Sequence, residues 1–334
     1  MRVERSTDGW ERDMYDVTAE VRTDDGSTRV VCSVPLPVAP EVVWDAVATA
    51  EGIASWFVSC AMEPRVGGRI VQFADPGAAD PTTGPEAAAE AMLTATVGEI
   101  TEYSPPTAGA PGVFAYVERD WMGEGVPVPP WETSCEVVDD GEGGSVLTLR
   151  SGFGSGGELA GQSVSGSVDG WAQALTVLAH RLTHRPADGV VTVDAATDPV
   201  DETVPELWAR VTSQLIAPAA GVGGHPGGDA GGGAGGNGVV ARSGEVGGIV
   251  VTESEASRTL ILSAPVDGML ELFAFPAGET HEDAAGRAAL ALRVYEYVDA
   301  PGGDGRPLGA AAVDVTPTWE APRWRAWLEG LIGA

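Results

Sequence analysis

The sequence feature that most restricts the fold of this chain is one amphipathic helix that follows a series of extended runs. Trp171, Leu175, Leu178 and Leu182 are spaced by four, three and four residues, so they share one face of a helix of about four turns. The segments before this helix are typical of strands, and an antiparallel sheet with one apolar face needs a covering layer. We therefore predict an α+β fold in which a curved antiparallel sheet wraps around a long C-terminal helix.

Extended runs and turn residues define the elements that we expect before that helix. The run 29–37 ends at two prolines, and Pro40 then opens a short helix, where its missing N–H has no partner to lose. Residues 14–26 and 27–34 predict an additional hairpin at the edge of the sheet. The acidic, glycine-rich link 139–144 is typical of a hairpin turn. Further strands are expected near residues 69–73, 93–103, 113–121, 132–138 and 145–152.

The length of 334 residues indicates roughly two domains. The clearest break in composition is the stretch 217–238, in which half of the residues are glycine and Val222 is the one large apolar residue. Burial cannot repay the entropy of ordering such a stretch. We expect it to be a mobile loop or linker.

Several motifs before residue 185 carry a resemblance to a known family. They are PLPVAPEVVWDAVATAEGIASWF, EPRVGGRI, GEITEYSPP, TSCEVVDDGEGGSVLTLRSGFG and DGWAQALTVLAHRL, in this order. Together they resemble the bacterial homologues of the activator of the heat-shock protein 90 ATPase, a family of the START-like (SRPBCC) superfamily. The resemblance covers residues 28–185 and makes residues 1–27 an N-terminal extension. It implies the helix-grip fold, with a cavity between the long helix and the sheet.

The second half of the chain repeats some of these signals in the same order. Leu207-Trp208 with Val211 echoes Val43-Trp44 with Val47, Val246-Gly247-Gly248 echoes Val66-Gly67-Gly68, and LALR at 290–293 echoes LTLR at 147–150. Trp324, Trp327, Leu328 and Leu331 form a last apolar helical face. We predict a degenerate second START-like domain over residues 186–334, with the stretch 217–238 as a loop inside it. Coincidence between short echoes in a chain rich in glycine, alanine and valine remains the alternative.

Large aromatic residues are the candidates for a ligand site. Apolar ligands are held by concave, aromatic-rich surfaces, and the resemblance supplies the cavity that such a site needs. The candidate cavity wall consists of Trp56, Phe57, Trp121, Trp171 and Leu175. For any single ring the alternative is that it fills the core, where its burial is worth a few kcal/mol.

Motifs for catalysis, cofactors and metals are weak. Residues 152–157 match G-x-G-x-x-G, but one chance match is expected at this glycine content, and we expect no helix directly behind it. His180 and His184 lie four residues apart, but no third ligand is near in sequence, and cationic side chains are favoured at a helix C-terminus. The sequence contains no G-x-S-x-G. We therefore expect no catalytic residues, no metal site and no cofactor.

The charge of the chain bounds its partners. The formal net charge is −30, with 19 basic residues, all of them arginine. Nucleic acids and anionic membranes are bound by clustered cations, so neither is expected as a partner. The first residues lack the apolar stretch of a secretory signal, which favours a cytoplasmic location.

Three functions remain as hypotheses from the sequence. The first is non-catalytic binding of a small hydrophobic or amphipathic molecule in a cavity beneath the long helix. The second is a protein-interaction role resembling that of a co-chaperone, with the partner unknown. The third is cyclase-like catalysis, which requires polar groups that converge in the cavity.

Overall fold

A computed structural model shows the chain as two compact units. Among the described residues, the first unit ends at Gly189 and the second begins at Val190. The described residues are 15–24, 26–73, 95–121, 128–154, 158–216, 238–241, 245–277, 286–298 and 317–333.

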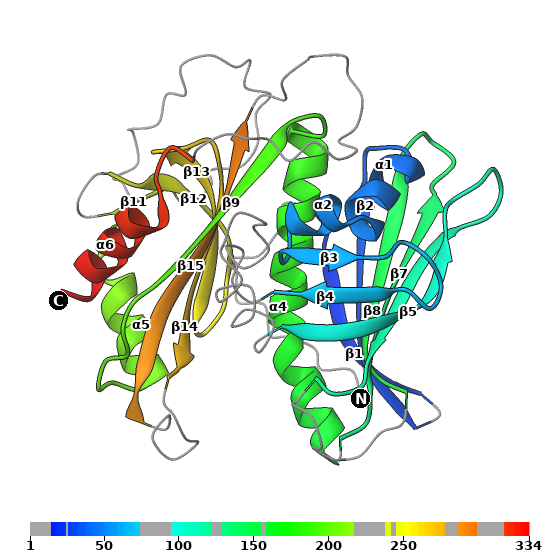
Figure 1. Ribbon diagram of the computed structural model, residues 1–334. Coiled ribbons are helices and arrows are strands. Elements are labelled where there is room, and N and C mark those ends of the chain that lie inside the picture. Colours follow the sequence, from blue (N-terminus) through cyan, green and yellow to red (C-terminus); the bar gives the residue numbers. More distant parts are fainter. Residues whose placement is uncertain are drawn as a thin grey trace. The chain divides into compact units, whose positions relative to one another are not determined.

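The first unit contains an antiparallel sheet in the order β1-β2-β8-β7-β6-β5-β4-β3. Together with its helices it forms an α+β fold, as the sequence predicts (Figure 1). The strands are β1 (Thr18–Asp24), β2 (Ser27–Leu36), β3 (Cys60–Met62), β4 (Arg69–Gln72), β5 (Thr96–Ser104), β6 (Gly112–Glu118), β7 (Trp131–Asp139) and β8 (Ser145–Phe153). The helices are α1 (Pro40–Ala48), α2 (Ala50–Ala54) and α4 (Glu158–His184).

Most strands lie where the alternation of apolar and polar residues predicts them. β1 and β2 form the expected hairpin at the edge of the sheet. One strand end is a correction, because β6 stops at Glu118 and Trp121 lies in the turn that follows. The turn between β7 and β8 places Gly141 and Gly143 at φ values of 79° and 95°, a backbone conformation that favours glycine.

Helix α4 covers one face of this sheet, which we call the inner face. It packs along β2 and also contacts β1 and β8 (Figure 1). Leu175, Leu178 and Leu182 of its apolar stripe are buried, and Val30 and Val34 of β2 are buried on the inner face. Burial of this stripe therefore joins helix and sheet into one core.

The short helices cover another part of the inner face. α1 packs against β6, β7 and β8, and α2 packs against β3. The Trp44 ring of α1 lies 5.2 Å from the Tyr103 ring. A Cβ atom at Gly112 would lie 2.9 Å from the Trp44 ring. Gly112 thus allows α1 to approach the sheet closely.

Helix α4 begins earlier than the apolar stripe predicts. It starts at Glu158, so the expectation that no helix follows residues 152–157 was wrong. Its first half is rich in glycine and serine, which lowers helix propensity, but Val164 is fully buried there. The strands beside it are antiparallel, so the parallel βαβ unit of a dinucleotide-binding fold is not formed by the described strands.

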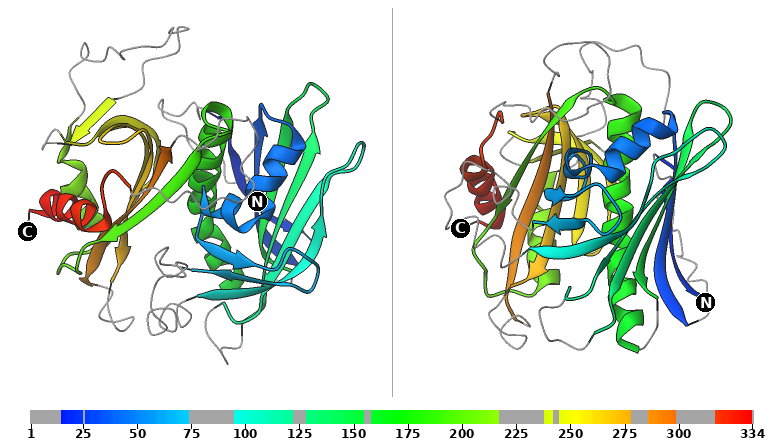
Figure 2. Two further views of the ribbon diagram at one scale, coloured as in Figure 1. Left: turned by 45° about the horizontal axis from the view of Figure 1, so that its top comes forward. Right: turned by 45° about the vertical axis from the view of Figure 1, so that its right-hand side comes forward.

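The second unit contains another antiparallel sheet, in the order β10-β11-β12-β13-β14-β15-β9. Both views of Figure 2 place its two helices on the same side of the sheet. Its strands are β9 (Gly189–Ala196), β10 (Leu215–Ile216), β11 (Gly238–Ala241), β12 (Gly247–Glu253), β13 (Ser257–Ala264), β14 (Gly268–Pro276) and β15 (Ala288–Val298). Its helices are α5 (Val204–Thr212) and α6 (Ala321–Ile332).

The helices of the second unit share one core with its sheet. Trp324, Trp327, Leu328 and Leu331 are buried in that core, as their spacing predicts. α6 packs against α5, which packs against β14 and β15. α6 has 12 residues, whereas α4 has 27, so the helix that ends the second unit is much shorter than that of the first.

The two sheets share a strand order. In the first sheet, β2 is followed by β8 and then by β7, β6, β5, β4 and β3. In the second sheet, β9 is followed in the same way by β15 and then by β14, β13, β12, β11 and β10. The LTLR and LALR echoes fall on β8 and β15, which hold equivalent places. The two glycine pairs do not hold equivalent places. Gly67-Gly68 precede β4, whereas Gly247-Gly248 begin β12, whose equivalent in the first sheet is β5.

Two sequence expectations concern segments that are described in part or not at all. The stretch 217–238 lies outside the described residues, except for Gly238 at the start of β11. In the part of the chain that is described, no helix has both the length and the apolar character needed to span a membrane.

Truncation of one leucine in the α4 stripe tests how far this helix closes the core. We expect Leu178→Ala to lower the free energy of unfolding by about 2–5 kcal/mol, because it removes a fully buried side chain and leaves a cavity. Urea denaturation followed by circular dichroism measures the change. The exposed Thr183→Ala on the same helix is the control, with an expected change within about 0.5 kcal/mol. Equal losses in the two variants would contradict the packing described here.

Candidate functional site

One row of residues crosses the inner face of the first sheet where β6 ends. Gly98, Glu118, Trp131 and Phe153 are register partners on β5, β6, β7 and β8. Directly paired residues of neighbouring strands point to the same face, with Cβ atoms about 5 Å apart. We call these four residues the inner-face row. It places a carboxyl group beside two large aromatic rings.

Glycine at position 98 lets the side chains of Ile70 and Tyr116 approach β5 closely. A Cβ atom at this position would lie 2.9 Å from Ile70 Cγ2, 3.1 Å from Tyr116 Cδ2 and 3.4 Å from Glu118 Cγ. The first two distances are tighter than ordinary van der Waals contacts. Any larger residue would therefore displace Ile70 or Tyr116.

Glu118 is the unusual member of the inner-face row. Glu118 is only 8% exposed. No described residue forms a hydrogen bond or an ion pair with its carboxyl group. The carboxyl oxygens are nevertheless not completely enclosed. Burial raises the pKa of Glu118 to about 7, because removal from water penalises the charged form. The group can therefore exchange a proton near neutral pH.

A hydrogen-bonded polar network lies next to Glu118. Gln72 Nε2 donates to the Tyr116 hydroxyl oxygen at 2.8 Å, and Trp131 Nε1 donates to Ser151 Oγ at 2.7 Å. The hydroxyl oxygens of Thr133 and Ser151 are 2.9 Å apart. Burial, and next the charge of Glu118, raise the pKa of Tyr116, so this phenol stays protonated. These groups hold one another in place, whereas the carboxyl group of Glu118 is held by none of them.

The predicted cavity wall falls into two aromatic groups. Trp121 joins Trp131 and Phe153, with ring centroids 5.3 and 5.7 Å from its own. Phe57 stacks on Trp171 at 4.7 Å, and this second group links to α4.

The remaining two predicted wall residues belong to the packed interior. Trp56 lies 5.6 Å from Phe57 but is buried, and its indole N–H donates to the Ala46 carbonyl at 2.9 Å. Leu175 is fully buried in the α4 stripe. Whether any of the five residues touches a ligand stays a prediction.

The sequence analysis missed Glu118, Tyr116 and Trp131. A signal was present, because Phe114, Tyr116 and Glu118 share one phase of the β6 alternation. A glutamate in phase with two aromatic residues on a buried strand face is a polar residue in an apolar position. Burial of such a residue costs stability unless it is paired, and unpaired buried carboxyl groups concentrate at functional sites.

The two helical histidines are not both cations at the C-terminus of α4. The Tyr15 hydroxyl and His180 Nδ1 are 2.5 Å apart, and His180 is buried. Burial, followed by the neighbouring His184 and Arg185, lowers the pKa of His180 to about 4. The expected favourable interaction of an imidazolium with the helix dipole was therefore wrong for His180, which is neutral at ordinary pH. Among the described residues, no cluster of three metal-ligating side chains occurs.

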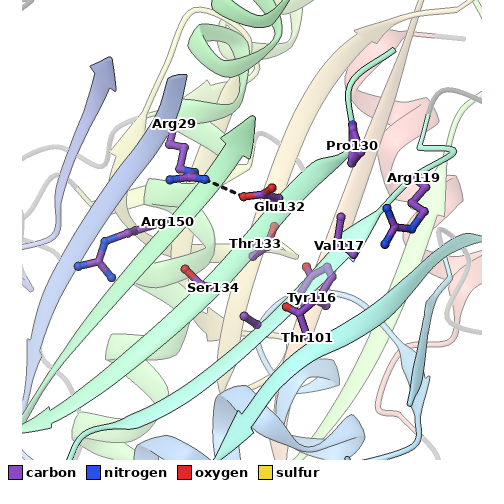
Figure 3. A pocket seen from close by; sticks show the side chains of 11 residues that line it. Arg29, Thr101, Tyr116, Val117, Arg119, Pro130, Glu132, Thr133, Ser134 and Arg150 are labelled. Atoms are coloured by element: carbon purple, nitrogen blue, oxygen red, sulfur yellow. Dashed lines mark hydrogen bonds and ion pairs between the residues drawn. The ribbon is translucent and has the colours of Figure 1, made fainter. Parts of the chain in front are cut away.

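A groove of about 470 Å³ lies on the outer face of the same sheet (Figure 3). Arg29 Nη2 donates to Glu132 at 2.6 Å, Arg150 Nη1 donates to Glu136 at 2.9 Å, and Arg119 lies 3.6 Å from Glu99. Because each guanidinium already has a carboxylate partner, the groove offers little unpaired positive charge. Its lining consists of Arg29, Thr101, Ala115, Tyr116, Val117, Arg119, Pro130, Glu132, Thr133, Ser134 and Arg150.

Comparisons with known proteins do not settle the family. No family model and no curated protein matches the chain. The crystal structure of CalU16 from Micromonospora echinospora is 16% identical over 51% of this chain and 86% of its own, with a TM-score of 0.34. DynU16, from the dynemicin biosynthetic locus, is 17% identical over 81% of this chain and 87% of its own, with a TM-score of 0.33.

A third solved structure shows a higher identity than these two. It is the Bordetella parapertussis protein encoded by gene BPP1335, which is 25% identical over 49% of this chain and 78% of its own, with a TM-score of 0.34. At TM-scores of this size, the likenesses decide neither fold nor function.

The pH dependence of stability tests the environment of Glu118. The raised pKa means that the folded chain holds this proton more tightly than the unfolded chain, so the group costs stability as pH rises from about 4.5 to 7. We expect Glu118→Gln to raise the free energy of unfolding by about 1–3 kcal/mol near pH 8 and to change it little near pH 4.

Urea denaturation of both proteins at the two pH values measures this difference. Glu271 of the second unit has a pKa raised to about 7 by burial as well, but it contributes equally to both proteins. An equal effect of the substitution at the two pH values would show that Glu118 is not buried as a carboxylic acid.

Proposed function

We propose that the first unit is a START-like (SRPBCC) helix-grip domain that binds a small hydrophobic or amphipathic molecule between α4 and the inner face. The antiparallel sheet, the long helix packed along β2 and the aromatic rings of the inner-face row support this proposal. The relation to the activators of the heat-shock protein 90 ATPase rests on the sequence motifs alone. A cytoplasmic location likewise remains a proposal.

The observation that carries the proposal is the unpartnered Glu118 beside Trp131. A residue retained only to fill the core would be apolar, because burial of a carboxyl group costs free energy that no internal partner offsets here. Functional sites are the places where proteins keep such costs. The contrast with Glu271 supports this view, because that buried glutamate accepts a hydrogen bond from the Tyr295 hydroxyl at 3.0 Å.

The magnitudes explain why an apolar surface needs a polar group beside it. An aromatic ligand body that buries roughly 150 Å² gains about 4 kcal/mol at ~25 cal/mol per Å², before the cost of association. Micromolar affinity requires about 8 kcal/mol. The remaining binding free energy has to come from further apolar contacts of the ligand and from its polar interactions with the protein.

We propose further that the second unit, over residues 186–334, is a degenerate copy of the domain over residues 28–185. Its support is the shared strand order and the burial of Leu207 and Trp208 on α5, as of Val43 and Trp44 on α1. The short α6 makes it a poor candidate for the same kind of ligand site. We assign ligand binding to the first unit.

Catalysis is the second candidate, and the same residue favours it. A buried acid with a pKa of about 7 is suited to proton transfer near neutral pH, and Tyr116 lies on the same face. Mass spectrometry of a bound molecule before and after incubation separates the two functions. An unchanged molecule supports binding, and a converted one supports catalysis.

Native mass spectrometry and calorimetry test the binding function. We expect freshly purified protein to carry a small molecule, or to bind the neutral probe 1-naphthylmethanol with a Kd of about 10–100 µM. Trp131→Ala and Trp171→Ala are each expected to weaken the affinity about tenfold, because they remove aromatic surface.

The matched control is Trp208→Phe on α5, which should leave the affinity unchanged while circular dichroism shows that every variant is folded. Unchanged affinity in a folded Trp131→Ala variant would remove this ring from the site. Absence of both a co-purified molecule and probe binding would contradict the proposed function.

A further inference from the structure

We propose that the ligand of the first unit is an amphipathic amine, and that Glu118 selects it by pairing with its protonated nitrogen. The inference rests on the proposed function and deepens it from an apolar ligand to a ligand of defined charge. It is carried by the geometry of the inner-face row, in which a carboxyl group without an internal partner stands between Gly98 and Trp131.

The described chain supplies no cation to the inner side of this row. The register partners of Glu118 are a glycine and a tryptophan, and Tyr116, on its own strand, stays a neutral phenol. Arg119 follows directly in sequence, but it lines the outer groove (Figure 3). Its guanidinium lies 3.6 Å from the Glu99 carboxylate there. The partner that compensates the carboxylate is therefore expected to come with the ligand.

The aromatic side chains beside the carboxyl group fit the same ligand. Trp131 is the register partner of Glu118, and the Trp121 ring lies 5.3 Å from the Trp131 ring. Indole faces attract cations, most strongly where water is excluded, and they also bury an apolar body. A carboxylate next to indole rings thus complements an ammonium group attached to an aromatic or aliphatic body.

The charge of the whole chain favours the same class of ligand. A formal net charge of −30 raises the local concentration of cations and lowers that of anions. Anionic ligands of the same size would face both this field and the buried carboxyl group. The geometry therefore points to selection by charge rather than by apolar area alone.

Binding should depend on pH in one direction. Below its raised pKa, Glu118 is a neutral acid and attracts a cation much more weakly than the carboxylate does. Amine binding is therefore expected to strengthen as pH rises through about 7. The titratable group that faces it among the described residues is Tyr116, which remains protonated across this range. Binding of a neutral alcohol should change little.

Three matched probes test the inference on the full chain by calorimetry. They are 1-naphthylmethylamine, 1-naphthylmethanol and 1-naphthylacetate, which share one apolar body and differ in charge. At about pH 8 we expect the amine to bind about tenfold more tightly than the alcohol, and the acetate to bind more weakly than both. At about pH 5.5 the preference for the amine should fall to about twofold or less.

Glu118→Gln should abolish this preference, so that the amine and the alcohol bind within about twofold of each other. Glu99→Gln is the matched control, because it removes the same charge from an exposed position on the outer face of the neighbouring strand.

The outcomes separate the two proposals. Equal binding of the three probes overturns the selection of amines but leaves the ligand-binding function intact. Failure of all three to bind, together with absence of a co-purified molecule, contradicts the function itself. A preference for the amine that persists in Glu118→Gln assigns the selection to another group and overturns the role of Glu118. If this variant does not fold, the wild-type order of the probes at the two pH values still decides, since an absent or pH-independent preference overturns the proposal.

Discussion

The packing of α4 along β2 is the interaction on which the first unit depends. The helix covers β2, β1 and β8, whereas the two short helices cover β3 and the region around β6 to β8. One face of a single curved sheet is therefore enclosed by separate pieces of the chain. Where β6 ends, the inner face carries polar side chains among aromatic ones. The side of the sheet on which Glu118 lies follows from the alternation of β6.

Local patterns predicted much of this fold, because the period of apolar residues reports which face of an element is buried. The five strands from β4 to β8 and the apolar stripe of α4 lie where the period places them. The period of apolar residues did not predict the first half of α4, which is rich in glycine and serine. The first half of α4 has poor helix propensity, and contacts such as that of Val164 decide its conformation.

The site was less predictable than the fold, since its contacts join residues distant in sequence. Gln72 and Tyr116 are separated by 44 positions, and Arg29 and Glu132 by 103. Sequence reasoning favoured large aromatic residues. They include Trp121, which lies next to two further rings, and Trp56, whose indole N–H donates to the backbone of α1. It overlooked Glu118 because charged residues are common in so acidic a chain. What distinguishes this glutamate is its phase along β6.

The register of β6 also separates opposite charges that are adjacent in sequence. Glu118 lies on the inner face, and Arg119 lines the outer groove. A shift of one residue would exchange the two faces and place the arginine inside the sheet. The strand thus keeps the nearest guanidinium away from the buried carboxyl group, while Glu99 provides that guanidinium with a partner outside. A carboxyl group isolated in this way retains its capacity to pair, and a protonated nitrogen from outside the chain is the partner that matches its charge.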